Sequence, residues 1–180
     1  MKIRLRLNTN SINKAIDDLK EYKLSLRRKS EEFVGRLLDE GIKVAYQHVP
    51  SEYSGYIEFT KEITSGQQVV GVLTGKDTKP FISTWIVKGG EKSVEVSGIL
   101  MAEFGSGWLA NVMWDVTGVG QGTFPDQTHA FDTQGWFWTD TEGVKHHSRG
   151  TNPTYPMYSA EMAMLRNIDS IAREVFGSGI

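Results

Sequence analysis

The sequence contains no cysteine among its 180 residues. This absence excludes a disulfide framework, a thiolate nucleophile and a metal site built on thiolates. Long hydrophobic runs are also lacking, and no apolar stretch approaches the roughly 18 residues that a membrane-spanning helix needs. The first residues, MKIRLRLNTN, alternate charged and aliphatic side chains and so lack the apolar core of a secretory signal. We therefore expect synthesis in the cytoplasm and no membrane partner.

Net charge is small as well, at −2, and by itself gives no sign of nucleic-acid binding. The charges are unevenly distributed, because residues 1–48 hold 11 Lys and Arg against 7 Asp and Glu, whereas residues 49–180 hold 9 against 15. This asymmetry can orient the protein against a partner, although a solvated helix face is the simpler interpretation. The hydrophobic content of 39% is typical of a soluble globular chain, and the length favours a single domain, 1–180.

The N-terminal quarter predicts a short strand followed by a very long helix. Lys2–Leu7 alternates basic and aliphatic residues, which is the pattern of a half-exposed strand. From residue 11 to about residue 48, apolar side chains recur at steps of three, four and seven, which predicts one amphipathic helix ending before Pro50. About 35 helical residues span about 50 Å. That length exceeds what one sheet face of a small protein needs, so we expect part of the helix to pack on another subunit.

The middle of the chain is rich in predicted strands. The candidates are Tyr56–Ile63, Gln67–Leu73, Phe81–Val87, Ser93–Phe104 and Gln134–Asp140, all within a sheet region of about 55–140. The short spacing between the first four favours antiparallel neighbours, because no crossover helix fits between them. A long glycine-bearing loop is expected at about 105–133, which is typical of a functional or partner-contacting segment. A C-terminal helix is expected at about 156–176.

Three histidines make a metal-dependent hydrolase one candidate function. His129, His146 and His147 can approach one another if the long loop folds over the last turn. Adjacent histidines on an extended segment point to opposite sides, however, and the helical ligand spacing of metal hydrolases is missing. Histidines that hold a loop by hydrogen bonds are the favoured interpretation. No nucleophile elbow, P-loop or dinucleotide fingerprint accompanies them, so we expect no catalytic residue, no metal and no cofactor.

Aromatic residues crowd into the long loop and the last predicted strand. They are open to three interpretations: anchors of the core and loop, hot spots of a protein interface, or the stacking platform of a cell-wall or carbohydrate-binding module. On the strand, alternation places Trp136 and Trp138 on one face and Phe137 on the other, so both faces need cover. We expect a second subunit to supply one cover. The interface hypothesis names Trp108, Trp114, Phe124, Trp136, Trp138 and Tyr155.

The stretch HHSRGTNPTYPMYSA, residues 146–160, is interpreted as a structural joint before the last helix. Pro156 suits the first helical turn, because a backbone N–H there has no partner within the helix and its absence removes no hydrogen bond. Glu161 suits the positive end of the helix dipole. Met157 and Tyr158 are both expected to pack the start of the helix on the sheet. The joint residues are Pro153, Pro156, Met157 and Tyr158.

The order of these landmarks resembles that of a known family. The helix SINKAIDDLKEYKLSLRRKSEEFVGRLLDEGIKVA precedes a strand closing in MAEFGSG, an aromatic strand GWFWTD, the segment H-x-x-x-GTNPTYPMYSA and a final helix ending IAREVF. This order resembles the tail-completion proteins (head–tail joining, neck or minor structural proteins) of bacteriophages with long flexible tails. Ala102–Gly107 and His146–Ala160 correspond to the signature segments of the family, whereas Trp108–Thr133 and Lys76–Pro80 have no counterpart.

The resemblance implies an α+β fold in which a long N-terminal helix and a C-terminal helix pack against an antiparallel β-sheet. It implies a non-enzymatic virion-assembly protein, a subunit of a ring, commonly a hexamer, at the head-proximal end of the tail. The expected partners are further copies of the chain, the tail tube or terminator, and the head connector, with DNA only as passing cargo. The expected location is the host cytoplasm during assembly and then the head–tail junction of the virion. A ring requires two different, matching patches on every subunit.

Overall fold

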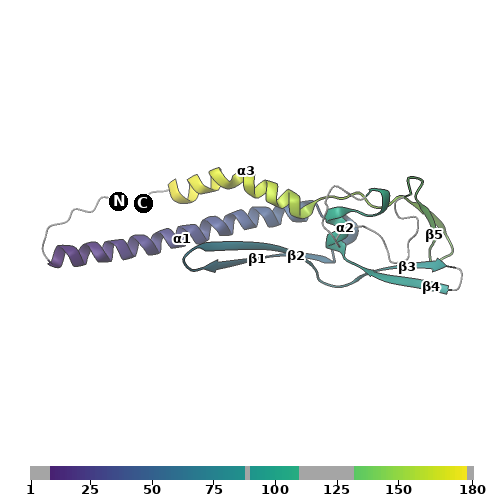
Figure 1. Ribbon diagram of the computed structural model, residues 1–180, viewed down its shortest axis with the longest axis horizontal. Coiled ribbons are helices and arrows are strands. Elements are labelled where there is room, and N and C mark those ends of the chain that lie inside the picture. The colour runs from purple at the N-terminus through teal and green to yellow at the C-terminus, as the bar shows by residue number, and fades with distance from the viewer. Residues whose placement is uncertain (1–8, 88–89, 110–131, 178–180) are drawn as a thin grey trace.

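The computed structural model describes residues 9–87, 90–109 and 132–177 of the chain. Helix α1 (Thr9–Gln47) forms the long axis of the molecule, and α3 (Pro156–Gly177) lies beside its second half (Figure 1). The two helices run antiparallel, because Ala45 packs near Ala160 while Arg36 pairs with Glu174. The hairpin of β1 (Ile57–Ser65) and β2 (Val69–Asp77) covers another side of α1, and a second sheet lies at the end of the molecule remote from Thr9 (Figure 1).

The predicted long helix is confirmed. α1 has 39 residues, about 58 Å at 1.5 Å per residue, and it is followed by a short 3-10 turn, η1 (Ser51–Tyr53), after Pro50. Its C-terminal half buries the apolar stripe at Leu38, Gly41 and Ala45. A long amphipathic stripe gains its stability by packing, and here α3 and the hairpin supply that packing.

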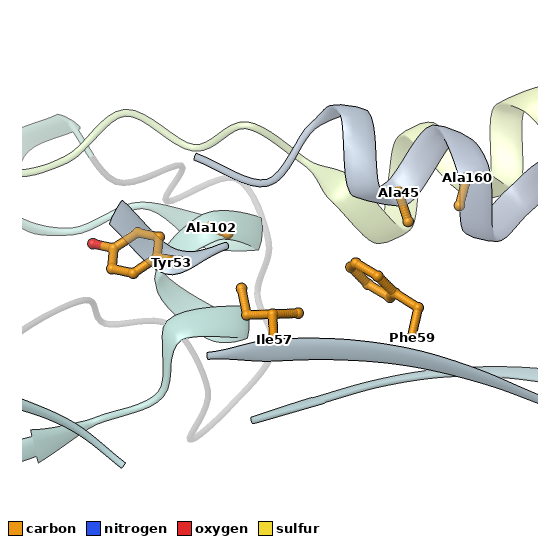
Figure 2. Close-up of a cluster of buried hydrophobic side chains, with 6 residues drawn as sticks. All are labelled: Ala45, Tyr53, Ile57, Phe59, Ala102 and Ala160. Carbon is orange, nitrogen blue, oxygen red and sulfur yellow. The ribbon is translucent and has the colours of Figure 1, made fainter. Parts of the chain in front are cut away.

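Small residues let the hairpin lie flat on α1. A Cβ atom added at Gly71 would lie 2.4 Å from Val34 Cγ1, and one at Gly41 would lie 2.9 Å from Leu73 Cδ1. The core continues towards the C-terminal end of α1 (Figure 2). Its buried residues are Ala45, Tyr53, Ile57, Phe59, Ala102 and Ala160.

The prediction of a strand over Ser93–Phe104 is wrong in its second half. β3 (Phe81–Val87) pairs with β4 (Gly90–Val96), but the chain then turns into a short helix, α2 (Gly98–Phe104). Ser97 causes the change, because its hydroxyl accepts a hydrogen bond from Leu100 N–H at 3.3 Å and so caps the helix. The Oδ1 atom of Asp77 accepts a second bond from Ile99 N–H at 3.0 Å. The MAEF of MAEFGSG, expected as a strand end, is therefore helical.

The α+β class with antiparallel sheets is confirmed, but the strands form two sheets and not one. β5 (Trp136–Thr139) and β6 (Lys145–Ser148) join the second sheet in the order β4-β3-β5-β6, and the sequence did not predict β6. α1 packs on the two-stranded sheet, beside α3. The predicted strand Lys2–Leu7 and most of the loop at 105–133 lie outside the described residues. Within the described ranges, no helix is long and apolar enough to cross a membrane.

Candidate functional site

Two segments about fifty residues apart in the sequence meet at the start of α3. The carbonyl of Ala102 accepts hydrogen bonds from Thr154 N–H at 2.7 Å and Tyr155 N–H at 3.2 Å. Ser106 and Thr151 exchange two backbone hydrogen bonds, of 2.9 and 3.2 Å. The end of α2 and the stretch before α3 therefore form one unit, the helix joint, and it contains both segments on which the family resemblance rests.

Glu103 caps α3 across this joint. Its carboxylate accepts hydrogen bonds from Met157 N–H at 2.7 Å and Tyr158 N–H at 3.1 Å. These are first-turn amides that have no partner within the helix, and a negative charge there also suits the helix dipole. Sequence reasoning assigned an acidic role in this turn to Glu161, which is exposed, and missed Glu103. No local pattern signals the role of Glu103, because its partners lie 54 and 55 residues later.

The predicted joint residues differ in their burial. α3 begins at Pro156, where the sequence predicts the helix start, and the Pro156 side chain is fully buried. Met157 packs against the core cluster, as expected, whereas Tyr158 is 43% exposed and does not pack into the core. Tyr155 has a positive φ of 55° and is half-buried, with its ring 6.3 Å from that of Tyr158. Pro153 packs against Gly105, where a Cβ atom would lie 2.8 Å from the Pro153 Cδ atom.

The histidines hold the joint and the neighbouring hairpin. His146 Nε2 lies 2.7 Å from Asp140 Oδ2, and His147 Nε2 lies 2.6 Å from the Gln134 carbonyl. The two rings stand on opposite faces of β6, since successive residues of a strand point to opposite sides. His48, which the sequence did not single out, places Nδ1 3.0 Å from the Thr154 carbonyl.

These histidines do not converge on an ion site in the described part of the chain. No group of three or more His, Asp or Glu side chains there is arranged to hold a metal ion. His129, the third candidate ligand, lies outside the described residues. The geometry therefore gives the metal-dependent hydrolase no support.

Asp140 organises the turn between β5 and β6. Its Oδ1 atom accepts hydrogen bonds from Glu142 N–H at 2.9 Å and Val144 N–H at 2.8 Å, while Oδ2 faces His146. The hydrogen bond to His146, followed by the one from Val144 N–H, holds the pKa of Asp140 below its ordinary value of 3.8. The carboxylate form is thus the one that the hairpin stabilises.

The aromatic residues of the last strand are engaged unequally. Trp138 stacks on His146, with centroids 4.4 Å apart, and Trp136 lies against Gly107. Phe137 points the other way and is 77% exposed. Trp108 is 47% exposed, whereas Trp114 and Phe124 lie outside the described residues.

Phe137 belongs to an exposed apolar face of the second sheet, which we call the distal patch. Ile86 aligns with Thr139 across β3 and β5, so alternation places Ile82, Ile86 and Phe137 on the same face. Ile82 is 60% exposed and Ile86 is 41% exposed. Sequence reasoning selected the two tryptophans of β5 for an interface and missed these three residues.

A second apolar surface lies at the opposite end, on the N-terminal half of α1, and we call it the helix stripe. α3 ends near the middle of α1, where Phe176 packs against Phe33 with centroids 5.7 Å apart, so the first half of α1 extends past it (Figure 1). The apolar spacing of α1 nevertheless continues along this half. The exposed members are Ile12, Ile16, Leu19 and Leu26.

A scan of the chain against protein-family models finds no match, and searches of the curated proteins and of the solved structures find none either.

Proposed function

We propose that this chain is a non-enzymatic virion-assembly subunit that self-associates into a ring and joins a phage tail to the capsid connector. The observation that carries the proposal is a pair of unlike apolar surfaces, the helix stripe and the distal patch, at opposite ends of an elongated subunit. A cyclic ring uses heterologous contacts, so each subunit must present two different patches. Contiguous exposed apolar surface on a soluble chain marks an interaction site.

The phage assignment rests on the resemblance, and the helix joint is where its two signature segments lie. The segments Ala102–Gly107 and His146–Ala160 correspond in sequence to the signature segments, although the first begins in a helix and not in a strand, and they are direct hydrogen-bonding partners in this fold.

The carbohydrate-binding alternative receives no comparable support. A stacking platform needs aromatic faces that are open to a sugar ring. Trp138 is stacked on His146 and Trp136 lies against Gly107, so each ring already has a packing partner, whereas Trp108 is 47% exposed. The two tryptophans of the last strand are therefore engaged within the chain itself, and the side chains of Trp85 and Trp114 lie outside the described residues.

The experiment that tests the proposal is deletion of the encoding gene from a phage that carries it. Full heads and finished tails should accumulate unjoined, and supplying the wild-type chain should restore joined particles. A Phe137→Glu variant should restore them poorly, whereas Thr141→Glu, which places the same charge on the exposed turn of the same sheet, should restore them fully. Joined, infectious particles formed without the chain would refute the proposal.

A further inference from the structure

An apolar groove of about 780 Å³ runs between the hairpin and the helices. Its lining includes Val34 and Leu37 of α1, Leu100 and Phe104 of α2, and Met164 of α3. The β2 strand borders it through Gly71, Leu73 and Gly75. No β1 residue lines it, so the groove follows the outer edge of β2 and not the middle of the sheet.

That edge carries backbone groups without a partner among the described residues. In an antiparallel pair, residues bonded across the pair alternate with residues whose N–H and C=O point outwards. Thr78 N–H donates to the Tyr56 carbonyl at 2.7 Å, and Gly66 N–H donates to the Gln68 carbonyl at 3.0 Å. Even-numbered residues therefore form the backbone hydrogen bonds across the hairpin. The backbone N–H and C=O groups of the odd-numbered residues of β2 point away from β1, towards the outer edge of the sheet.

A free strand edge beside an apolar groove is suited to β-augmentation, in which an added strand gains main-chain bonds and places alternate side chains in the groove. The segment Lys2–Leu7 has the required pattern, with Ile3, Leu5 and Leu7 on one face and basic residues on the other. Six extended residues span about 20 Å, which matches a strand of ordinary length. We propose that Lys2–Leu7 of a second copy of this chain adds to the outer edge of β2 and places its aliphatic face in the groove.

The segment must come from a second copy because its own chain cannot reach. α1 begins at Thr9, and the axial distance from Thr9 to Val34, the groove residue nearest to it on α1, is about 38 Å at 1.5 Å per residue. The eight residues before Thr9 extend at most about 28 Å. Even Met1 of the same chain therefore falls short of the groove.

The inference rests on the self-association in the proposed function and names the device that produces it. Because a single residue, Asn8, separates the inserted segment from the start of α1 at Thr9, the helix stripe of the inserted copy is brought against its neighbour. The donor segment and the acceptor edge are different surfaces, so each copy can give one strand and accept another, as a ring requires.

Cysteine cross-linking tests the inference directly, because the natural chain has no cysteine that could form competing disulfides. A full-length Arg4→Cys chain is mixed with a Val72→Cys or a Thr74→Cys chain under mild oxidation, and disulfide-linked dimers of the two chains are measured. The controls are Glu62→Cys and Thr60→Cys, the cross-strand neighbours of those two positions on β1. The β2 positions should cross-link at least about tenfold more than the β1 positions, because neighbouring strands lie about 4.8 Å apart and the next strand lies twice as far away.

A second variant separates this device from other modes of assembly. Leu5→Asp should abolish the cross-link and weaken self-association about tenfold or more, whereas Leu5→Ile should preserve both, because only the aspartate loses the apolar contact in the groove. Cross-links of equal yield at β1 and β2, or none at β2, would overturn the inference. If deletion of the gene still leaves heads and tails unjoined in that case, the proposed function stands and only this device fails.

Discussion

Glu103 shows how a single carboxylate can determine where a distant helix begins. It satisfies two amides at the start of α3, although it belongs to α2. Amides at the first turn of a helix have no intrahelical partner. A carboxylate in this position accepts their hydrogen bonds, and its negative charge interacts favourably with the positive end of the helix dipole.

Replacing Glu103 with alanine should therefore lower the free energy of unfolding by about 1–2 kcal/mol, the usual effect of losing a helix cap. Glu161→Ala is the matched control, because Glu161 is exposed on the first turns of the same helix, and it should change stability by less than about 0.5 kcal/mol. Urea denaturation followed by circular dichroism measures both. Equal effects of the two substitutions would contradict the capping role.

Gly150 is required by the close approach of two backbone segments at the joint. Its φ is 109°, and an added Cβ atom would lie 1.8 Å from the Ser106 carbonyl oxygen. Gly143 has a similarly positive φ of 85°, but nothing lies within 4 Å of its Cβ position.

Gly150→Ala should abolish folding or destabilise the chain by more than about 3 kcal/mol, because backbone strain and a clash add together. Gly143→Ala should cost only the strain, about 1–2 kcal/mol. Thermal unfolding of the two variants measures the difference. If Gly150→Ala unfolded at the same temperature as Gly143→Ala, the close contact at the joint would be disproved.

The β5–β6 hairpin contains a carboxylate, Asp140, whose ionised form is stabilised by its hydrogen bonds in the folded state. The folded hairpin holds the pKa of Asp140 below its ordinary value of 3.8. A carboxyl group whose pKa is lower in the folded state adds stability above its unfolded pKa, and this contribution is lost as the pH falls through the folded value.

Lowering the pH from about 6 to about 2 should therefore loosen the hairpin once the pH falls below the ordinary Asp value. Nuclear Overhauser contacts between the Trp138 and His146 rings report this change, since the rings stack with centroids 4.4 Å apart. Asp140→Asn should weaken the contacts at neutral pH and remove their dependence on acid. Contacts that persist unchanged at the acid end in the wild-type chain would contradict this account.

Elements defined by local periodicity were predictable from the sequence. The extent of α1, the start of α3 and the bounds of β3 follow from apolar spacing and from prolines. The sequence did not reveal α2, because GILMAEF is compatible with both strand and helix and only the Ser97 cap and Asp77 select the helix.

The position of β5 beside β3 was not predictable, since the two strands are joined through a single register pair, Ile86 and Thr139. The candidate surfaces were predictable in part. Alternation placed Phe137 opposite the tryptophans, but which face stays open depends on tertiary packing. The Trp138 ring is covered by the stacked ring of His146, which belongs to β6, a strand that the sequence did not predict.

The whole molecule is a rod with apolar surfaces at both ends, which is a shape suited to contacts between copies (Figure 1).

A Leu19→Glu substitution should weaken self-association about tenfold or more, because a charge replaces an apolar contact of the helix stripe. Its unfolding temperature should stay close to that of the wild type, since Leu19 is 52% exposed in the single chain. Lys20→Glu, one residue away, is the control and should assemble normally. Analytical ultracentrifugation measures the masses, and equal assembly of both variants would remove the stripe from the interface.

The most direct test of the central claim is electron microscopy of purified phage tails incubated with gold-labelled chain. The account predicts a ring of label at one tail end only, the end that joins the head. It also predicts that labelled tails gain the ability to attach to DNA-filled heads. Label spread along the tail, or no label on tails or on connectors at any concentration of the chain, would contradict the assignment.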